Sequence, residues 1–268
     1  MTYGKDDIVC LLGTEWDQIG DLLSGLDDAS WSAPALPGWD VHAVVAHLIG
    51  TERMLAGKSL PRADGATGDH VRNDIGLANE RWVAALRGLP PAQMLTEFRA
   101  IAAERLASLT AMPAADFDAP SWTPAGEGTY GRWMQIRVFD CWMHEQDIRA
   151  AVRVPGHEAG PVAECSLDEV VGALGYIIGK RGRAPDGSSV LIRLTGPLER
   201  DLRVVTSGRA KVVDSIDGEP TATISLPSSL FLRLAGGRED PEAALARIEL
   251  DGDVALARQL AMSLAFTI

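Results

Sequence analysis

The sequence lacks a membrane-length apolar run, and it has few residues that could cross-link a fold. No uninterrupted apolar stretch among the 268 residues approaches the ~20 that span a bilayer. The opening residues, MTYGKDDIVC, are too polar for a signal peptide. The three cysteines, Cys10, Cys141 and Cys165, are widely spaced and form no CxxC pair. We therefore expect no membrane span, no disulfide framework and a reducing, cytoplasmic location.

Positive charge is also scarce. The chain has 25 Lys and Arg against 37 Asp and Glu, for a formal net charge of −12. Binding to nucleic acid phosphates needs a basic patch, so this balance argues against a nucleic-acid partner. The HExxH motif of zinc proteases is missing as well. The 46% hydrophobic and 23% charged residues are ordinary for a globular protein, and the length suits one large or two modest domains.

The front of the chain reads as a helical bundle. Apolar residues recur at spacings of three and four, as in Ile8, Leu11 and Leu12, and Asp40 is placed to cap a helix. The stretches SLPRADGATGD and 112–130 are rich in Pro, Gly, Ser and Thr and predict loops. We expect a domain over 1–156 with four to five helices, at about 5–26, 40–57, 71–88, 91–111 and 131–153.

The back of the chain changes pattern. Residues 164–179 still read as a helix, but four short β-type runs follow: SVLIRLTG, DLRVVTSG, AKVVDSI and TATISLP. Helical patterns return in SSLFLRLAGG and DVALARQLAMSLAFTI. This order predicts a second domain over 160–268, of α+β class, with a small and mostly antiparallel sheet.

One expected helix carries an unusual density of ionisable groups. The stretch RVFDCWMHEQDIRAA, residues 137–151, is otherwise largely apolar. Residues three or four apart share a helix face, so Asp140, His144 and Asp147 are expected on one inward face. Glu145 lies about 100° away from His144 and is expected to point elsewhere. On another helix, His47 falls on an apolar inner stripe.

Three further expectations concern neighbouring residues. His42 lies five residues before His47, well round the helix, and is expected to face water. Arg137 and Arg149 flank the ionisable stretch and are expected to be solvent-exposed helix residues. Cys141 is rotated off the inner face and has no adjacent base at helical spacing, so it is interpreted as a packed thiol and not as a nucleophile.

A divalent metal would explain the buried carboxylate and imidazoles. An unpartnered buried carboxylate costs several kcal/mol or more. His47, Asp140 and His144 would supply two nitrogens and one oxygen, and three protein ligands with a vacant position are typical of a catalytic metal site. Asp147 would then orient a ligand imidazole. Spacing alone leaves the alternative of a plain Asp–His hydrogen bond and an ordinary core histidine.

Two stretches of the chain resemble a known family. LPGWDVHAVVAHLIGTE and FDCWMHEQDIRAAV are similar to the signatures of the mycothiol-dependent maleylpyruvate isomerase family, within the DinB/YfiT-like superfamily of metal-binding bundles. The back half, with GEPTATISLPSSLFLRLAGG and IELDGDVALARQLAMSL, is similar to the sterol-carrier-like domain that often follows. The resemblance covers nearly the whole chain. It implies an α+β protein: a DinB-like four-helix bundle followed by a small α+β domain.

The resemblance also implies a set of site residues. By position, the family's metal ligands fall on His47, Asp140 and His144. The isomerase has Glu where this chain has Asp140, whose side chain is one methylene shorter. Whether Asp140 coordinates directly therefore stays open, with Asp147 and Glu145 as alternative ligands.

In the relatives, a divalent ion, usually zinc, brings a low-molecular-weight thiol to an electrophile; in actinobacteria that thiol is mycothiol. The resemblance thus implies a metal-dependent mycothiol transferase or isomerase acting on a small electrophilic substrate. The alternative is a non-catalytic metal- or ligand-binding protein of the same fold.

Overall fold

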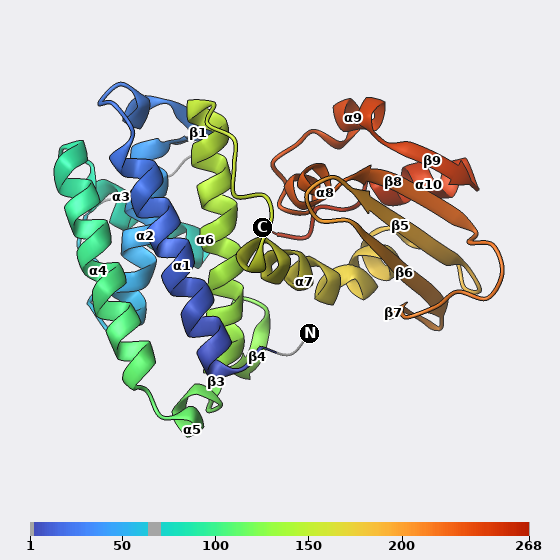
Figure 1. The fold of residues 1–268 in the computed structure, drawn as a ribbon, viewed down its shortest axis with the longest axis horizontal. Helices are drawn as coiled ribbons and strands as arrows, with labels where there is room; N and C mark the ends of the chain where they lie inside the picture. The colour runs from blue at the N-terminus through green and yellow to red at the C-terminus, as the bar shows by residue number, and fades with distance from the viewer. Residues whose placement is uncertain (1–2, 64–70, 268) are drawn as a thin grey trace. The chain divides into compact units, whose positions relative to one another are not determined.

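The computed structural model describes residues 3–63 and 71–267, so part of the expected loop SLPRADGATGD lies outside the described residues. The chain divides into two compact units, Met1–Gly156 and His157–Ile268, the first helical and the second containing a sheet (Figure 1). Within the described parts of the chain, no helix is long and apolar enough to cross a membrane. The expected α+β class is confirmed.

The five long helices expected in the front unit are all present. Their starts follow from local chemistry: the Asp40 side chain accepts the Ala43 N–H, and the Thr129 side chain accepts the Arg132 N–H, which satisfies donors that a helix start leaves free. The helices are α1 (Lys5–Ser24), α2 (Val41–Leu55), α3 (Asp74–Leu86), α4 (Pro91–Ala111) and α6 (Tyr130–Val152).

The core of this unit lies among α1, α2, α4 and α6, and α3 packs on α2. Fully buried side chains from the four core helices include Leu12, Leu48, Phe98 and Met134. At Gly50 a Cβ atom would lie only 2.4–2.7 Å from atoms of the Trp82 side chain. Glycine at this position therefore lets α3 approach α2 closely.

Two segments expected to be irregular contain short paired strands. The expected loop 112–130 forms α5 (Ala114–Phe117) and a hairpin of β3 (Pro120–Thr123) and β4 (Gly126–Thr129). The break before α2 contains a short turn of 3-10 helix (Ser30–Ser32) and a second ribbon, β1 (Pro34–Leu36) with β2 (Trp39–Asp40). Strands of two to four residues show too few alternations for a period-two pattern to be recognised.

The second unit is built on a five-stranded sheet in the order β7-β6-β5-β8-β9. β5 and β8 are parallel and the other pairs are antiparallel, which confirms the mostly antiparallel expectation. Buried residues alternate along β6 and β8, so one face of each strand points into a core. The strands are β5 (Ser189–Thr195), β6 (Arg200–Ser207), β7 (Arg209–Val213), β8 (Ala222–Pro227) and β9 (Glu249–Gly252); β9 was not expected. The helices are α7 (Pro161–Tyr176) with a π turn (Ile177–Arg181), α8 (Ser228–Ala235), α9 (Pro241–Ala244) with a 3-10 turn (Leu245–Arg247), and α10 (Val254–Ala261).

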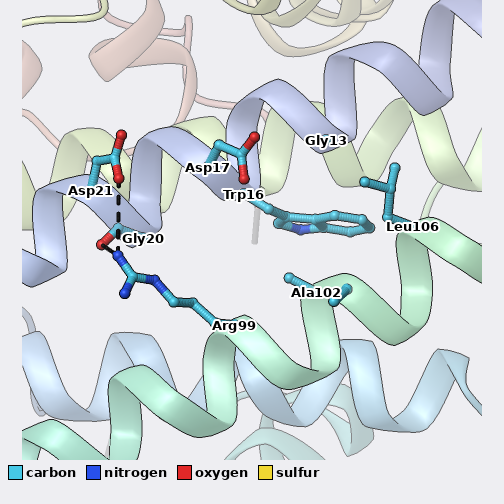
Figure 2. Close-up of a pocket in the computed structure, with 9 residues that line it drawn as sticks. Gly13, Trp16, Asp17, Gly20, Asp21, Arg99, Ala102 and Leu106 are labelled. Carbon is cyan, nitrogen blue, oxygen red and sulfur yellow. Dashed lines mark hydrogen bonds and ion pairs between the residues drawn. The ribbon is translucent and has the colours of Figure 1, made fainter.

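A pocket of about 290 Å³ lies between α1 and α4 (Figure 2). Gly13 and Gly20 of α1 contribute no side chain to it, and Arg99 of α4 donates a hydrogen bond to the Gly20 carbonyl at 3.2 Å. None of the ionisable residues singled out in the sequence lines this pocket. The candidate site lies instead between α2 and α6.

Candidate metal centre

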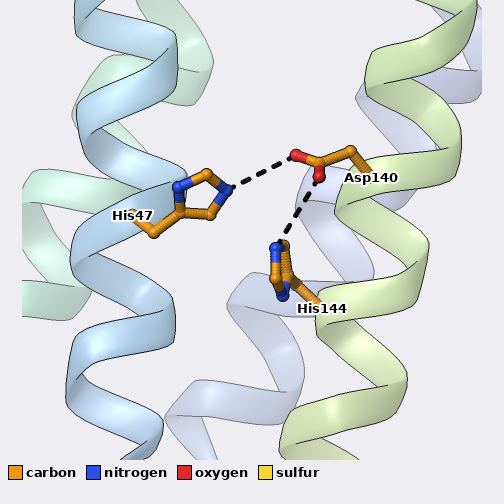
Figure 3. A group of neighbouring side chains, drawn as sticks. All are labelled: His47, Asp140 and His144. Atoms are coloured by element: carbon orange, nitrogen blue, oxygen red, sulfur yellow. Dashed lines mark ion pairs between the residues drawn. The ribbon is translucent and has the colours of Figure 1, made fainter. Parts of the chain in front are cut away.

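Three of the residues expected to bind a metal lie together in the helical unit. His47 comes from α2, and Asp140 and His144 come from successive turns of α6. One donor atom from each lies within 4.8 Å of the others. Figure 3 shows both imidazoles directed at the carboxylate: His47 Nε2 is 3.5 Å from Asp140 Oδ2, and His144 Nε2 is 3.7 Å from Oδ1.

The separation of 3.5 Å lies within the range for two ligands of one cation, the separation of 3.7 Å is slightly longer, and both exceed an ordinary hydrogen bond. Two ligands bound at zinc-ligand distances with a tetrahedral angle are about 3.3–3.6 Å apart. A hydrogen bond between such groups would be shorter, at about 2.7–3.2 Å. Among the described residues, neither ring nitrogen of buried His47 has a hydrogen-bond partner. The donor set and its spacing therefore fit a divalent metal ion.

The protonation states also suit a metal. Burial lowers the pKa of His47, which favours the neutral imidazole that a metal needs. Burial alone would raise the pKa of Asp140, but the charge of Arg137 and the two neighbouring imidazoles hold this pKa well below its usual range. Burial thus favours a neutral His47 imidazole beside an ionised Asp140 carboxylate.

Asp147 and Glu145, the two alternative ligands, differ in their contacts with the three donors. Asp147 is 2% exposed, and its Oδ2 lies 3.1 Å from His144 Nδ1. This contact can fix the proton on Nδ1 and leave Nε2 free to face Asp140. Glu145 is fully buried, pairs with Arg149 at 2.7 Å and does not join the three donors. Beside it lies Glu15, whose pKa is raised well above its usual value by burial and by the Glu145 charge.

Asp140 is linked to a series of buried ion pairs. Arg137 donates to Asp140 Oδ2 and to Glu52 Oε1, the latter at 2.8 Å from Nη2. Glu52 also accepts from Arg105 Nε at 3.0 Å. Arg137, Glu52 and Arg105 are only 3%, 1% and 3% exposed. Because they come from α6, α2 and α4, these contacts join three helices of the bundle.

Three expectations about solvent exposure were wrong. Arg137 is buried because Glu52, 85 residues earlier in the chain, receives its guanidinium. The Arg149 side chain is only 12% exposed because it pairs with Glu145. His42 is 8% exposed and its Nε2 lies 2.9 Å from the Leu89 carbonyl, which satisfies one ring nitrogen away from water.

Trp39, the tryptophan of the family-like stretch LPGWDVHAVVAHLIGTE, is a neighbour of the site that was assigned no role there from the sequence. Its ring centroid lies 5.3 Å from that of His47 and 6.3 Å from that of His144. Its indole N–H donates to Glu80 Oε1 at 2.6 Å, which fixes the ring against the imidazoles. The available signal was its position next to Asp40, the cap of the helix that carries His47.

The centre is not fully closed. The side chains of His47 and His144 are 8% and 7% exposed, whereas that of Asp140 is 34% exposed. Three protein donors leave a coordination position for an exogenous ligand on a four-coordinate ion. The arrangement can therefore bind a cation and leave a coordination position for a further small molecule.

Known structures share the fold described above for this chain. The crystal structure of the mycothiol-dependent maleylpyruvate isomerase aligns with a TM-score of 0.57 and 17% identity, over 89% of this chain and 93% of that one. A histidine-to-alanine variant of that isomerase aligns with a TM-score of 0.56 and 17% identity, over 94% and 96%. A search of curated proteins found no match.

Family descriptions match both units. The mycothiol maleylpyruvate isomerase N-terminal domain matches residues 12–149, and the C-terminal domain of the same family matches residues 164–259. The first match includes all three candidate donors, and the two matches together extend over both the bundle and the sheet. The chain therefore belongs to the mycothiol maleylpyruvate isomerase family.

Proposed function

We propose that the protein is a metal-dependent enzyme that transfers or adds a small thiol, with mycothiol as the co-substrate, to a small electrophilic substrate. The reaction is of the maleylpyruvate isomerase type, and zinc is the expected ion. The observation that carries this proposal is the convergence of His47, Asp140 and His144, whose donor atoms lie within 4.8 Å of one another in the bundle.

The proposed division of labour follows from the contacts. His47 and His144 would each hold the ion through Nε2, and Asp140 through a carboxylate oxygen. A divalent cation held there would lower the pKa of a bound thiol, ordinarily near 8.5, and would so supply a nucleophilic thiolate at neutral pH. Asp147 holds the His144 ring, and Trp39 with Glu80 forms a fixed wall beside both imidazoles.

The nature of the thiol and of the electrophile is proposed from the family and its solved structures, which are named for mycothiol and maleylpyruvate. The donor set supports thiol chemistry in general, because a divalent ion with an open coordination position binds an anionic sulfur. An unsaturated carbon next to a carbonyl is the matching class of electrophile.

The first prediction concerns metal binding. Protein purified without chelator is expected to contain about one divalent ion per chain, and His47→Ala is expected to lose it because one of three donors is gone. His42→Ala is the matched control, since His42 is also buried on α2 but bonds the Leu89 carbonyl. Elemental analysis of the three proteins measures the result. Equal metal content in all three, or none in the native protein, would contradict the proposal.

The same preparation separates catalysis from a structural role. After substitution with cobalt, titration with a thiol should produce sulfur-to-cobalt charge-transfer absorption as sulfur enters the coordination sphere. If the absorption spectrum of bound cobalt does not change when thiol is added, the alternative of a non-catalytic metal-binding protein is favoured.

A further inference from the structure

We propose that Arg137, held by Glu52, is a positioning residue that aligns Asp140 for the metal and sets the spacing between the two helices that carry the donors. This inference rests on the proposed metal site and names residues outside the donor set. Three observations support the inference: the contacts at Asp140, the position of Glu52 and the balance of charge among the buried side chains.

The first step is that the two oxygens of the Asp140 carboxylate have different partners. Arg137 donates to Oδ2, the oxygen that also faces His47 Nε2 at 3.5 Å, whereas Oδ1 faces His144 Nε2 at 3.7 Å. The guanidinium occupies one lone-pair direction of Oδ2, so the two carboxylate oxygens are less free to bind the ion together. One-oxygen coordination keeps the fourth position of a tetrahedral ion open for an exogenous ligand.

The second step is the link between helices. Glu52 follows His47 on α2, and Arg137 precedes Asp140 on α6. Arg137 donates to one oxygen of Glu52, Oε1, from Nη2 at 2.8 Å and from Nε at 3.1 Å, so the position of that oxygen relative to the guanidinium is restricted. Because the pair joins the two helices beside the donors, it fixes how far His47 lies from Asp140 and His144.

The third step concerns charge. Arg105 and Arg137 carry two positive charges, and Glu52 and Asp140 carry two negative charges, so this group is balanced without an ion. A cation bound to Asp140 shares that carboxylate with Arg137. The carboxylate therefore neutralises less of the cation's charge than it would without Arg137. A more positive centre attracts an anionic sulfur more strongly, especially where little water screens the charges.

Arg105 provides a matched control for Arg137. Both are 3% exposed and both pair with Glu52, so replacing either one leaves Glu52 with one arginine. The guanidinium of Arg105 also contacts the Tyr130 hydroxyl and Met134 Sδ, but within the described part of the chain no contact joins it to a candidate donor. Loss of either arginine should thus disturb the buried pair, and only loss of Arg137 should disturb Asp140.

The experiment compares Arg137→Met and Arg105→Met with the native protein. Zinc affinity is measured by competition with a chromophoric chelator, and coordination by the visible spectrum of the cobalt form. We expect Arg137→Met to bind zinc about tenfold or more weakly and to show an altered cobalt spectrum. Arg105→Met should stay within about threefold of native affinity, with an unchanged spectrum. Native-like circular dichroism establishes that each variant is folded.

If Arg137→Met does not fold, Arg137→Lys decides the question. Lysine keeps the charge, but a single ammonium cannot reproduce the forked contacts to Glu52 and Asp140. Affinity below the native value in this variant supports the proposal. Native affinity in Arg137→Lys, or equal losses in the two methionine variants, would overturn the positioning role alone. A native protein that binds no ion would overturn the proposed function itself.

Discussion

At the scale of single residues, partners across the bundle decide which polar groups are buried. His42 and His47 lie on the same helix, yet one bonds a carbonyl of the α3–α4 turn and the other faces Asp140. Helical spacing could place His47, Asp140 and His144 on inward faces because that argument needs only one helix at a time. It could not reveal that Arg137 is buried, since Glu52 lies 85 residues away in the chain.

Glu15 offers a test of burial at one residue. Its pKa lies well above the usual 4.5 because it is buried and lies beside Glu145, so the folded state holds a proton that the unfolded chain releases. Stability from this group is complete below about pH 4.5 and is lost as pH rises towards the folded-state pKa. Glu15→Gln removes this dependence. The free energy of unfolding of Glu15→Gln, relative to that of the native protein, should therefore increase above pH 4.5. The increase is about 1.4 kcal/mol per pH unit between pH 4.5 and the folded-state pKa of Glu15.

The measurement is urea unfolding followed by tryptophan fluorescence at a series of pH values. Glu127→Gln, at an exposed position on β4, is measured alongside as a surface control. A stability difference between Glu15→Gln and the native protein that is constant with pH would show that Glu15 is ionised in the fold.

At the scale of elements, the long helices could be predicted and the short strands could not. A helix of thirteen or more residues repeats its apolar spacing several times, and residues such as Asp40 and Pro91 mark the starts. The ribbons β1–β2 and β3–β4 have only two to four residues per strand. Their pairing depends on contacts between neighbouring strands, which composition does not contain.

The approach of α3 to α2 leads to a prediction about Gly50. Gly50→Ala places a methyl group 2.4–2.7 Å from Trp82 atoms, so the helices must separate or the indole must move. We expect a loss of about 1–3 kcal/mol in the free energy of unfolding. Gly88→Ala, where nothing lies within 4 Å, should be neutral or slightly stabilising. Equal stability of the two variants in urea unfolding would show that the Gly50 contact is relaxed at no cost.

At the scale of the whole molecule, metal should stabilise the unit that binds it. All seven tryptophans lie in Met1–Gly156, so fluorescence follows the unfolding of that unit; they are Trp16, Trp31, Trp39, Trp82, Trp122, Trp133 and Trp142. Zinc at a free concentration one hundred times its dissociation constant should stabilise this unit by about 2.7 kcal/mol. The expected shift to higher denaturant should disappear after chelation and be absent in His47→Ala. A shift that persists in that variant would place the ion elsewhere.

The unequal exposure of the donors has a stereochemical consequence. The imidazole side chains are nearly covered, whereas that of Asp140 is partly open, so solvent meets the donors chiefly at Asp140. A planar double bond that approached the proposed metal-bound nucleophile from there would present a single face. Addition to a prochiral carbon would then yield one handedness of product, chosen by the walls of the bundle and not by the reagents.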